Sequence, residues 1–325
     1  MRERWIDETR GYALLLVVFG HMGISYFGQY FTSCHLPIFY FLSGYLFSTR
    51  DKFPLFVKKK MKRLLIPYFC FGAILLTSSL VMGGVLSELL VKFAVQKRMY
   101  TIWFLTSLFF VNIIFYWITK LTRGKSWVIM AISLMMYISG VFYYKNGGQP
   151  LFWNIDTVLV ATIWFAAGFV LKNSCLPSRL SQMKNQKRNT LLMIAFSGIT
   201  YLSVVFINWE YCHEKFDIAM RTMGIPLLTL SATFAGIIMF MSVARLIQIG
   251  FVNYLGRNTM VYFALHQTVM IPLLGWVYAS LGLFTQESMT GDLIRLVLSI
   301  FLIFACLYPI DKLLNHSKLK FMLGL

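Results

Sequence analysis

The stretch Trp5–Gly23, WIDETRGYALLLVVFGHMG, decides how this chain folds and where its chemistry can lie. Its apolar run is typical of a membrane helix, and Arg10 and His21 lie eleven residues apart on it. That spacing is about three helical turns, or about 16 Å, so both side chains point to one face, with Asp7 close to the same stripe. If Arg10 lies at the water boundary, His21 lies near the middle of the bilayer. An ionisable side chain at that depth favours a functional site; the structural alternative is a hydrogen bond to a neighbouring helix.

The composition excludes a soluble domain. The chain has 325 residues, of which 58% are hydrophobic and 13% charged, whereas soluble domains carry about 25% charged residues. We therefore expect one all-α integral membrane domain over residues 1–325, a polytopic bundle of about ten transmembrane helices without a soluble domain. The predicted spans are 11–28, 34–49, 65–86, 101–121, 126–144, 154–172, 189–208, 223–247, 259–283 and 293–311, of which the second is short for a bilayer.

Lysine and arginine predict the orientation. With the N-terminus inside, the segments on that side hold 23 of the 30 basic residues. Because basic residues gather on the cytoplasmic side, we expect a multi-pass protein of the plasma or inner membrane with both termini in the cytoplasm. The 87–100 loop is the exception, because its Lys92, Lys97 and Arg98 lie on the opposite side.

The net charge of +18 indicates binding to anionic lipid or to an anionic cytoplasmic substrate. Nucleic acid is not expected, because the basic residues follow the membrane sides and accompany no nucleic-acid motif. The five cysteines show no metal-ligand or redox spacing. The sequence therefore predicts no metal site and no permanently bound cofactor.

A second histidine, His35, opens the apolar segment Cys34–Phe47, CHLPIFYFLSGYLF, only 14 residues after His21. A connection this short predicts an antiparallel hairpin, which places His35 beside His21 in the outer half of the membrane. Two imidazoles near one water-accessible channel could pass a proton or activate a hydroxyl group. The alternative is an interfacial histidine in a polar rim.

The basic run Lys58–Tyr68, KKKMKRLLIPY, is a candidate phosphate site. Its Lys60, Lys62 and Arg63 lie near the predicted cytoplasmic boundary, where arginine can bind phosphate through two parallel hydrogen bonds and lysine as a point charge. A coenzyme A thioester, with its three phosphate groups, would suit such a site. The alternative is an anchor against anionic lipid.

Two weaker candidates lie further along the chain. Trp103, in YTIWFLTSLFF, is expected at an outer interface, where tryptophan is common simply as an anchor. Asn258 and His266 lie in Gly256–Gln267, GRNTMVYFALHQ, with His266 about two turns into the membrane. A lone histidine there more often hydrogen-bonds a neighbouring helix than catalyses a reaction.

Taken together, these stretches resemble the membrane-bound acyltransferase 3 family, the ten-helix O-acyltransferases of carbohydrates. The resemblance rests on the order and spacing of several short motifs. They are Ile6-Asp7 with Arg10-Gly11 and His21, His35-Leu36-Pro37 with Phe41-Leu42-Ser43-Gly44, and the basic run that ends Arg63-Leu64-Leu65-Ile66-Pro67-Tyr68. The family typically has an Arg-x-x-Arg pair before Leu-Ile-Pro. Here Lys60 takes the first position, which keeps the charge but loses the bidentate geometry.

This compact form resembles fucose 4-O-acetylase-like enzymes and capsule or exopolysaccharide O-acetyltransferases. The resemblance implies acetyl-CoA as donor co-substrate, held by Lys60, Lys62 and Arg63. It implies a sugar hydroxyl as acceptor, on a glycan or lipid-linked sugar of a capsule, exopolysaccharide or cell surface. His21 would then act as general base or as an acyl relay.

Further roles follow from the same resemblance. Arg10 would stabilise the thioester, a phosphate or the developing oxyanion, oriented by Asp7. His35 would assist from the acceptor side. Trp103, Asn258 and His266 would bind substrate or support the site.

Two other classes stay open on sequence alone. A transporter or flippase for a glycolipid or acyl compound would use the same polar core without making bonds, and a sensor or scaffold would bind no donor. The sequence also leaves open the sugar and its hydroxyl, the length of the acyl group and a homo-oligomeric state.

Overall fold

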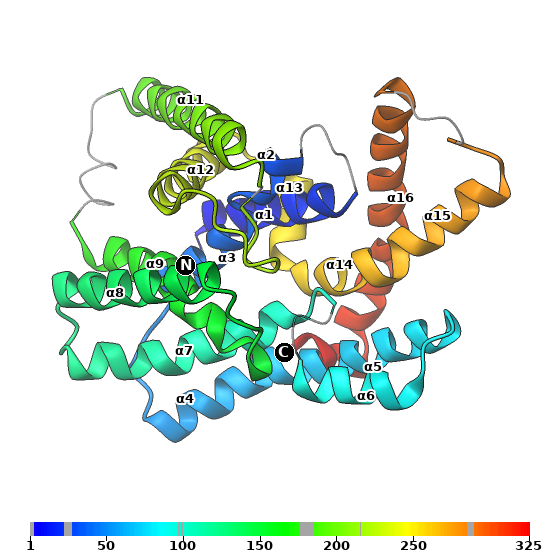
Figure 1. The fold of residues 1–325 in the computed structure, drawn as a ribbon, viewed down its shortest axis with the longest axis horizontal. Helices are drawn as coiled ribbons and strands as arrows, with labels where there is room; N and C mark the ends of the chain where they lie inside the picture. The colour runs from blue at the N-terminus through cyan, green and yellow to red at the C-terminus, as the bar shows by residue number, and fades with distance from the viewer. Residues whose placement is uncertain are drawn as a thin grey trace.

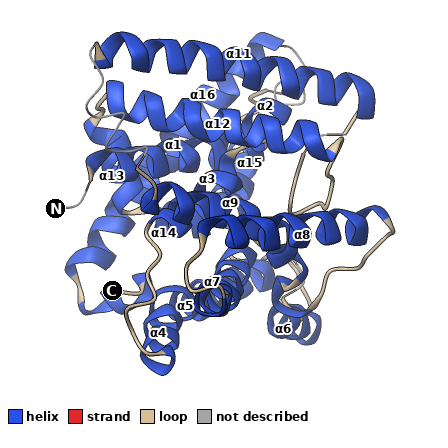
Figure 2. Ribbon diagram, turned by 90° about the vertical axis from the view of Figure 1, so that its left-hand side faces the viewer, coloured by secondary structure: helices blue, strands red, loops and turns tan. Residues whose placement is uncertain are grey.

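The computed structural model describes residues 3–22, 28–96, 98, 100–175, 185–214, 216–284 and 289–325. These residues form helices and loops without a strand, apart from an isolated bridge between Asp217 and Thr222. Figure 2 shows this helical architecture directly. The expected all-α polytopic fold is therefore confirmed.

Eight helices in the described part of the chain are long and apolar enough to cross a membrane. They are the joined elements α4 (Phe53–Lys60), η1 (Met61–Leu65) and α5 (Ile66–Val81), then α7 (Trp103–Leu121), α8 (Ser126–Lys145), α9 (Asp156–Asn173) with the short η2 (Phe152–Asn154) before it, α11 (Gln186–Cys212), α12 (Pro226–Leu246), the joined α14 (Thr259–Leu265), η3 (His266–Met270) and α15 (Ile271–Ser280), and α16 (Met289–His316). The other elements are α1 (Arg4–His21), α2 (Gly28–Thr32), α3 (His35–Tyr45), α6 (Leu86–Val95), α13 (Gly250–Arg257) and η4 (Lys318–Leu323).

These eight correspond to the last eight predicted spans, and the first two predicted spans differ from the structure. The predicted span 11–28 corresponds to α1, which begins at Arg4 and so contains a charged first half; residues 23–27 lie outside the described part. The predicted span 34–49 corresponds to α3, whose 11 residues rise only about 16 Å. Both helices are largely buried by other helices, so neither needs the length or the composition of a helix that faces lipid.

Glycines hold α1 tightly against α13. A Cβ atom added to Gly256 would lie 1.6 Å from the carbonyl oxygen of Asp7, and one added to Gly11 would lie 2.1 Å from the carbonyl oxygen of Val252. Only a residue without a side chain allows two backbones to approach this closely, as small residues do between membrane helices. The contact fixes the charged start of α1 against a segment about 245 residues away.

A second pair of glycines fixes α3 on α9 in the same way. A Cβ atom on Gly44 would lie 1.9 Å from the carbonyl oxygen of Phe165, and one on Gly168 would lie 2.0 Å from that of Phe41. The two helices thus approach reciprocally, each through its own glycine. Figure 1 shows α1 and α3 near the centre of the molecule, with α11 and α12 on one side and α16 on the other.

The central helices run between two polar regions. Trp5 at the start of α1 contacts Tyr45 at the end of α3, with ring centroids 5.2 Å apart, and Lys172 near the end of α9 lies 3.6 Å from Glu3. We call this the basic end. The opposite ends of α1 and α3 carry His21 and His35, and we call that the cavity end.

Candidate active site

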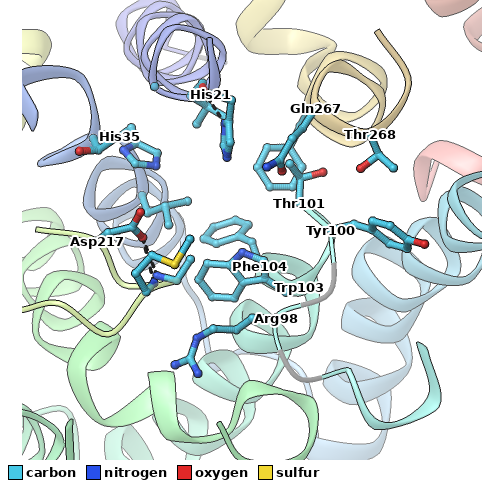
Figure 3. Close-up of a pocket in the computed structure, with 17 residues that line it drawn as sticks. His21, His35, Arg98, Tyr100, Thr101, Trp103, Phe104, Asp217, Gln267 and Thr268 are labelled. Atoms are coloured by element: carbon cyan, nitrogen blue, oxygen red, sulfur yellow. Dashed lines mark hydrogen bonds between the residues drawn. The ribbon is translucent and has the colours of Figure 1, made fainter. Parts of the chain in front are cut away.

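The cavity end encloses a cavity of about 340 Å³ between helices that are distant in the sequence (Figure 3). It is lined by the end of α1, the starts of α3 and α7, the turn η3 and two loops. The lining residues are Val17, Gly20, His21, Thr32, His35, Leu36, Arg98, Tyr100, Thr101, Trp103, Phe104, Asp217, Ala219, Met220, Phe263, Gln267 and Thr268. The structure therefore brings three of the predicted site residues, His21, His35 and Trp103, into one space.

His21 forms a pair with His266, and neither pattern nor spacing links the two in the sequence. The Nε2 atom of His266 lies 3.2 Å from Nδ1 of His21. The ring centroids are 5.0 Å apart and the rings meet edge to face. His266 is completely buried, whereas His21 is partly exposed and its ring points into the cavity (Figure 3). His266 thus contacts His21 on the side away from the cavity.

Nearby backbone carbonyls determine which ring nitrogen of neutral His21 and His266 carries the proton. Nδ1 of His21 lies 2.7 Å from the carbonyl oxygen of Val17. Nδ1 of His266 lies 2.8 Å from the carbonyl oxygen of Tyr262 and 3.1 Å from that of Phe263. A carbonyl can only accept, so each neutral ring carries its proton on Nδ1. The His21 Nδ1–H is then shared between the Val17 carbonyl and, at the longer distance, His266 Nε2. Nε2 of His21 carries the lone pair, as a general base requires.

A local irregularity places His266 behind His21. His266 is the first residue of the π-helical turn η3, in which the Ile271 N–H donates to the His266 carbonyl five residues earlier. Pro272, which follows, has no N–H and so favours a break in the regular helical pattern. The wide turn presents Gln267 and Thr268 to the cavity while His266 stays in the core. Such turns occur frequently at functional sites.

The remaining walls combine an imidazole with two aromatic rings. His35 is 6% exposed and lines the cavity from the first turn of α3. Trp103 and Phe104, at the start of α7, lie across the cavity from His21 (Figure 3). Trp103 is 6% exposed, so it is a cavity residue rather than an anchor at a lipid surface. An aromatic wall of this kind can stack against the apolar face of a sugar ring.

The cavity also contains a buried arginine, Arg98. Its side chain is 7% exposed and its Nη2 donates both to the carboxylate of Asp156 and, at 3.1 Å, to the hydroxyl oxygen of Tyr144. Its Nε and Nη1 atoms are buried and have no acceptor among the described residues. The guanidinium of Arg98 therefore lies at the cavity wall with two buried nitrogens whose hydrogen-bonding capacity is unused among the described residues.

The sequence carries an indirect signal for Arg98. It belongs to the 87–100 loop, whose basic residues contradict the orientation expected from the other loops. The structure explains this for Arg98, because its charge is neutralised inside the protein by Asp156 rather than held at a membrane surface. Lys97, in the same loop, lies outside the described residues.

Arg10 and Asp7 lie elsewhere, towards the basic end. The buried Asp7 carboxylate lies 3.8 Å from Nη1 of Arg10 and 3.3 Å from Nε of Arg257. Arg10 and His21 are three turns apart on one helix, about 16 Å along its axis, and Arg10 does not line the cavity. Arg10 can therefore contact a long ligand that reaches His21, but not an oxyanion that forms beside the histidine.

The basic run also lies at the basic end. The Nζ atom of Lys60 lies 5.3 Å from the ring centroid of Phe56 and 6.0 Å from that of Phe47. Lys62 and Arg63 are exposed in the π-helical turn η1. None of the three cations lines the cavity.

Asn258 connects helices rather than lining the cavity. It lies at the junction of α13 and α14. Its side chain donates to the carbonyl oxygen of Tyr254 at 3.1 Å and accepts from Asn315 of α16 at 3.3 Å. This position suits a supporting residue.

Comparison with known protein families identifies a match for this chain. The model of a family described as an acyltransferase domain matches residues 3–311, almost the whole chain. No curated protein and no solved structure matches. The match includes the histidine pair, the cavity and the basic run, and it confirms the family that the short motifs indicate. The chain belongs to the acyltransferase 3 family of membrane proteins.

Proposed function

We propose that this membrane acyltransferase moves an acetyl group from cytoplasmic acetyl-CoA to a hydroxyl group of a sugar. The acceptor would be a glycan or lipid-linked sugar of a capsule, exopolysaccharide or cell surface. The observation that carries the proposal is the His21–His266 pair, which points a lone-pair nitrogen towards a cavity with an aromatic wall. Family membership supports acyl transfer, and the aromatic wall supports a sugar acceptor.

His21 Nε2 is the proposed general base. It takes the proton of the acceptor hydroxyl as the hydroxyl oxygen attacks the thioester carbonyl. The new C–O bond forms, the C–S bond breaks, and the leaving thiolate takes the proton back from the imidazolium. His266 stabilises that imidazolium, because its Nε2 accepts the Nδ1–H of His21. A variant of the mechanism uses the same Nε2 as an acyl relay, which first takes the acetyl group and then passes it to the sugar.

The acceptor and the donor would approach from opposite ends. On the acceptor side, Trp103 stacks on the sugar and His35 assists at the hydroxyl. On the donor side, Lys60, Lys62 and Arg63 hold phosphate groups at the basic end. Arg10, oriented by Asp7, contacts the donor between the two ends, since its distance from His21 suits a phosphate or the arm of the donor better than the reacting carbonyl.

Transfer by purified protein tests the proposal. In nanodiscs with radiolabelled acetyl-CoA and a candidate polysaccharide, the wild type should release coenzyme A and label the glycan. His21→Gln keeps hydrogen bonding and approximate volume but removes the base, so transfer should fall about 10²–10⁴-fold.

His213→Gln is the matched control, because His213 directly follows α11 and does not line the cavity. It should leave the rate unchanged, and both variants should keep the thermal stability of the wild type. Movement of an unmodified glycolipid across the bilayer without any transfer would instead identify a flippase.

The orientation is part of the proposal and has its own test. With both termini in the cytoplasm of a cell (inner or plasma) membrane, loops 50–63 and 172–188 face inside and 209–222 faces outside. A single cysteine placed at residue 211 should react with an impermeant reagent in intact cells, and one at residue 52 should react only after lysis. Strong labelling at 181–186 in intact cells would overturn the orientation; residues 176–184 lie outside the described part of the structure.

A further inference from the structure

The basic end contains a second and larger hollow, a groove of about 830 Å³. It lies between the segment after α3, the connection from α7 to α8 and the end of α9. Its lining residues are Tyr45, Leu46, Phe47, Ser48, Thr49, Arg50, Thr119, Lys120, Arg123, Gly124, Ser126, Phe169, Lys172 and Asn173. We call it the basic groove.

Four cations from three separate segments converge on the basic groove: Arg50, Lys120, Arg123 and Lys172. No acidic residue is among the described lining residues. Among the described residues, the exposed Glu3, 3.6 Å from Lys172, is the acidic side chain that pairs with a cation of the groove. The groove therefore carries an excess of positive charge in a concave space, which attracts anions more strongly than the same charges on a flat surface.

Neighbouring groups make the groove suited to phosphate in particular. Lys172 is positioned over the ring of Tyr45 at 4.8 Å, and Lys120 over the ring of Tyr116 at 5.7 Å. Ser126 is the first residue of α8, so the groove also includes the start of a 20-residue helix, where the helix dipole favours an anion. Arginine, lysine, hydroxyl groups and a helix start are the usual partners of phosphate.

Orientation in the membrane does not explain this arrangement by itself. Positive-inside charges need only lie in the correct loops, without a common direction. Lys125 is in the same connection as Arg123, and Lys52 follows Arg50 by two residues, yet neither lines the groove. The loops thus contain both cations that line the groove and cations that do not.

We infer that the basic groove binds phosphate groups of the acyl donor and extends the donor site beyond Lys60 and Arg63. This rests on the proposed function. Phe47 connects the two regions, because it lines the groove and also lies 6.0 Å from the Nζ atom of Lys60. A coenzyme A thioester carries a pyrophosphate and a separate ribose phosphate, which two neighbouring basic regions can hold together. From the groove, α3 leads from Tyr45 to His35 at the cavity, about 15 Å away.

Binding of coenzyme A tests the inference without an acceptor. The protein is placed in nanodiscs of phosphatidylcholine alone, and the dissociation constant is measured by titration calorimetry. Arg123→Gln with Lys172→Gln should weaken binding at least about tenfold, since charge-assisted contacts to phosphate are lost. The effect should shrink as salt is raised.

The matched control is Lys125→Gln with Lys52→Gln, which removes two charges from the same face but none from the groove. Control binding should stay within about twofold of the wild type, and all variants should keep the same thermal midpoint. Equal losses of coenzyme A affinity in the groove and control variants would contradict the inference, because they would show that only the general charge of this surface matters.

Two further outcomes distinguish the sources of phosphate. Unchanged coenzyme A binding in the groove variant, together with loss of the stabilisation that phosphatidylglycerol gives the wild type, would overturn the inference in favour of a lipid headgroup. If the wild type itself binds no coenzyme A, the proposed donor and this inference fail together. If the wild type binds coenzyme A and the groove variant binds it equally well, this inference fails while the proposed donor stands.

Discussion

The polar residues around the cavity and the cations of the basic run differ in how far they are exposed. At the cavity end, His266, His35 and Arg98 are at most 7% exposed, and carbonyls or a carboxylate orient His266 and Arg98. At the basic end, Lys62 and Arg63 are exposed. Exposed charges are screened by salt and adapt to a ligand, whereas buried polar groups are costly unless they are precisely paired. We therefore expect substitutions at the cavity end to change stability or kcat, and those at the basic end to change KM.

Two similar turns, η1 and η3, also differ in whether their polar side chains are exposed or buried. Both η1 and η3 are five-residue π-helical turns followed by Ile-Pro, at Ile66-Pro67 and Ile271-Pro272. In η1 the turn exposes two cations, and in η3 it buries a histidine. The two turns share a backbone geometry, and the surrounding helices decide whether the side chains on it are exposed or buried.

The largest expected effect on stability comes from the buried ion pair at the cavity end. Arg98→Ala leaves the buried Asp156 with its Tyr144 and Leu151 donors but without its charged partner, which should lower the free energy of unfolding by about 3–5 kcal/mol. Arg98→Met with Asp156→Leu removes both charges and should be clearly more stable than the single variant. Denaturation in detergent measures both. If Arg98→Ala is as stable as the wild type, the buried ion pair does not stabilise the cavity end, and the contrast between the two ends fails.

The basic end should respond through donor affinity. Arg63→Ala should raise KM for acetyl-CoA, since loss of one charge-assisted contact costs about 1.5–3 kcal/mol, and kcat should change little. Arg63→Lys should recover only part of the affinity, because it keeps the charge but loses the bidentate geometry. An unchanged KM in Arg63→Ala would leave the basic run as a lipid anchor.

A smaller effect is expected where α1 packs against α13. Gly256→Ala places a methyl group against the Asp7 carbonyl, and such overpacking should destabilise the protein by about 1–3 kcal/mol. Gly250→Ala is the control on the same helix, because a Cβ atom there meets nothing within 4 Å. Equal thermal midpoints for the two variants would show that the glycine contact does not position α1.

The sequence predicts the parts of this molecule that depend on local pattern. Eight apolar spans, the shared face of Arg10 and His21 and the nearness of His35 to His21 follow from composition and spacing. The His21–His266 pair could not be predicted, because it joins residues 245 positions apart and no short motif specifies which helices pack together.

Charge patterns were the least informative part of the sequence. A count of basic residues by membrane side treats Arg98 as an anomaly, although it forms a buried ion pair with Asp156. The same count gives Arg123 and Lys125 equal weight, although only Arg123 lines the basic groove. Burial and convergence distinguish these cations, and both are properties of the tertiary structure.

A double-mutant cycle on kcat tests the central claim, that His266 holds His21 as the catalytic base. His266→Leu alone should slow acyl transfer, because the His21 Nδ1–H keeps the Val17 carbonyl but loses its second acceptor, which orients the ring and stabilises the imidazolium. In the His21→Gln background, the same substitution should cause no further loss, since residues that act as one unit are not additive. Losses that multiply in the double variant would show that the two histidines act separately and would contradict the mechanism.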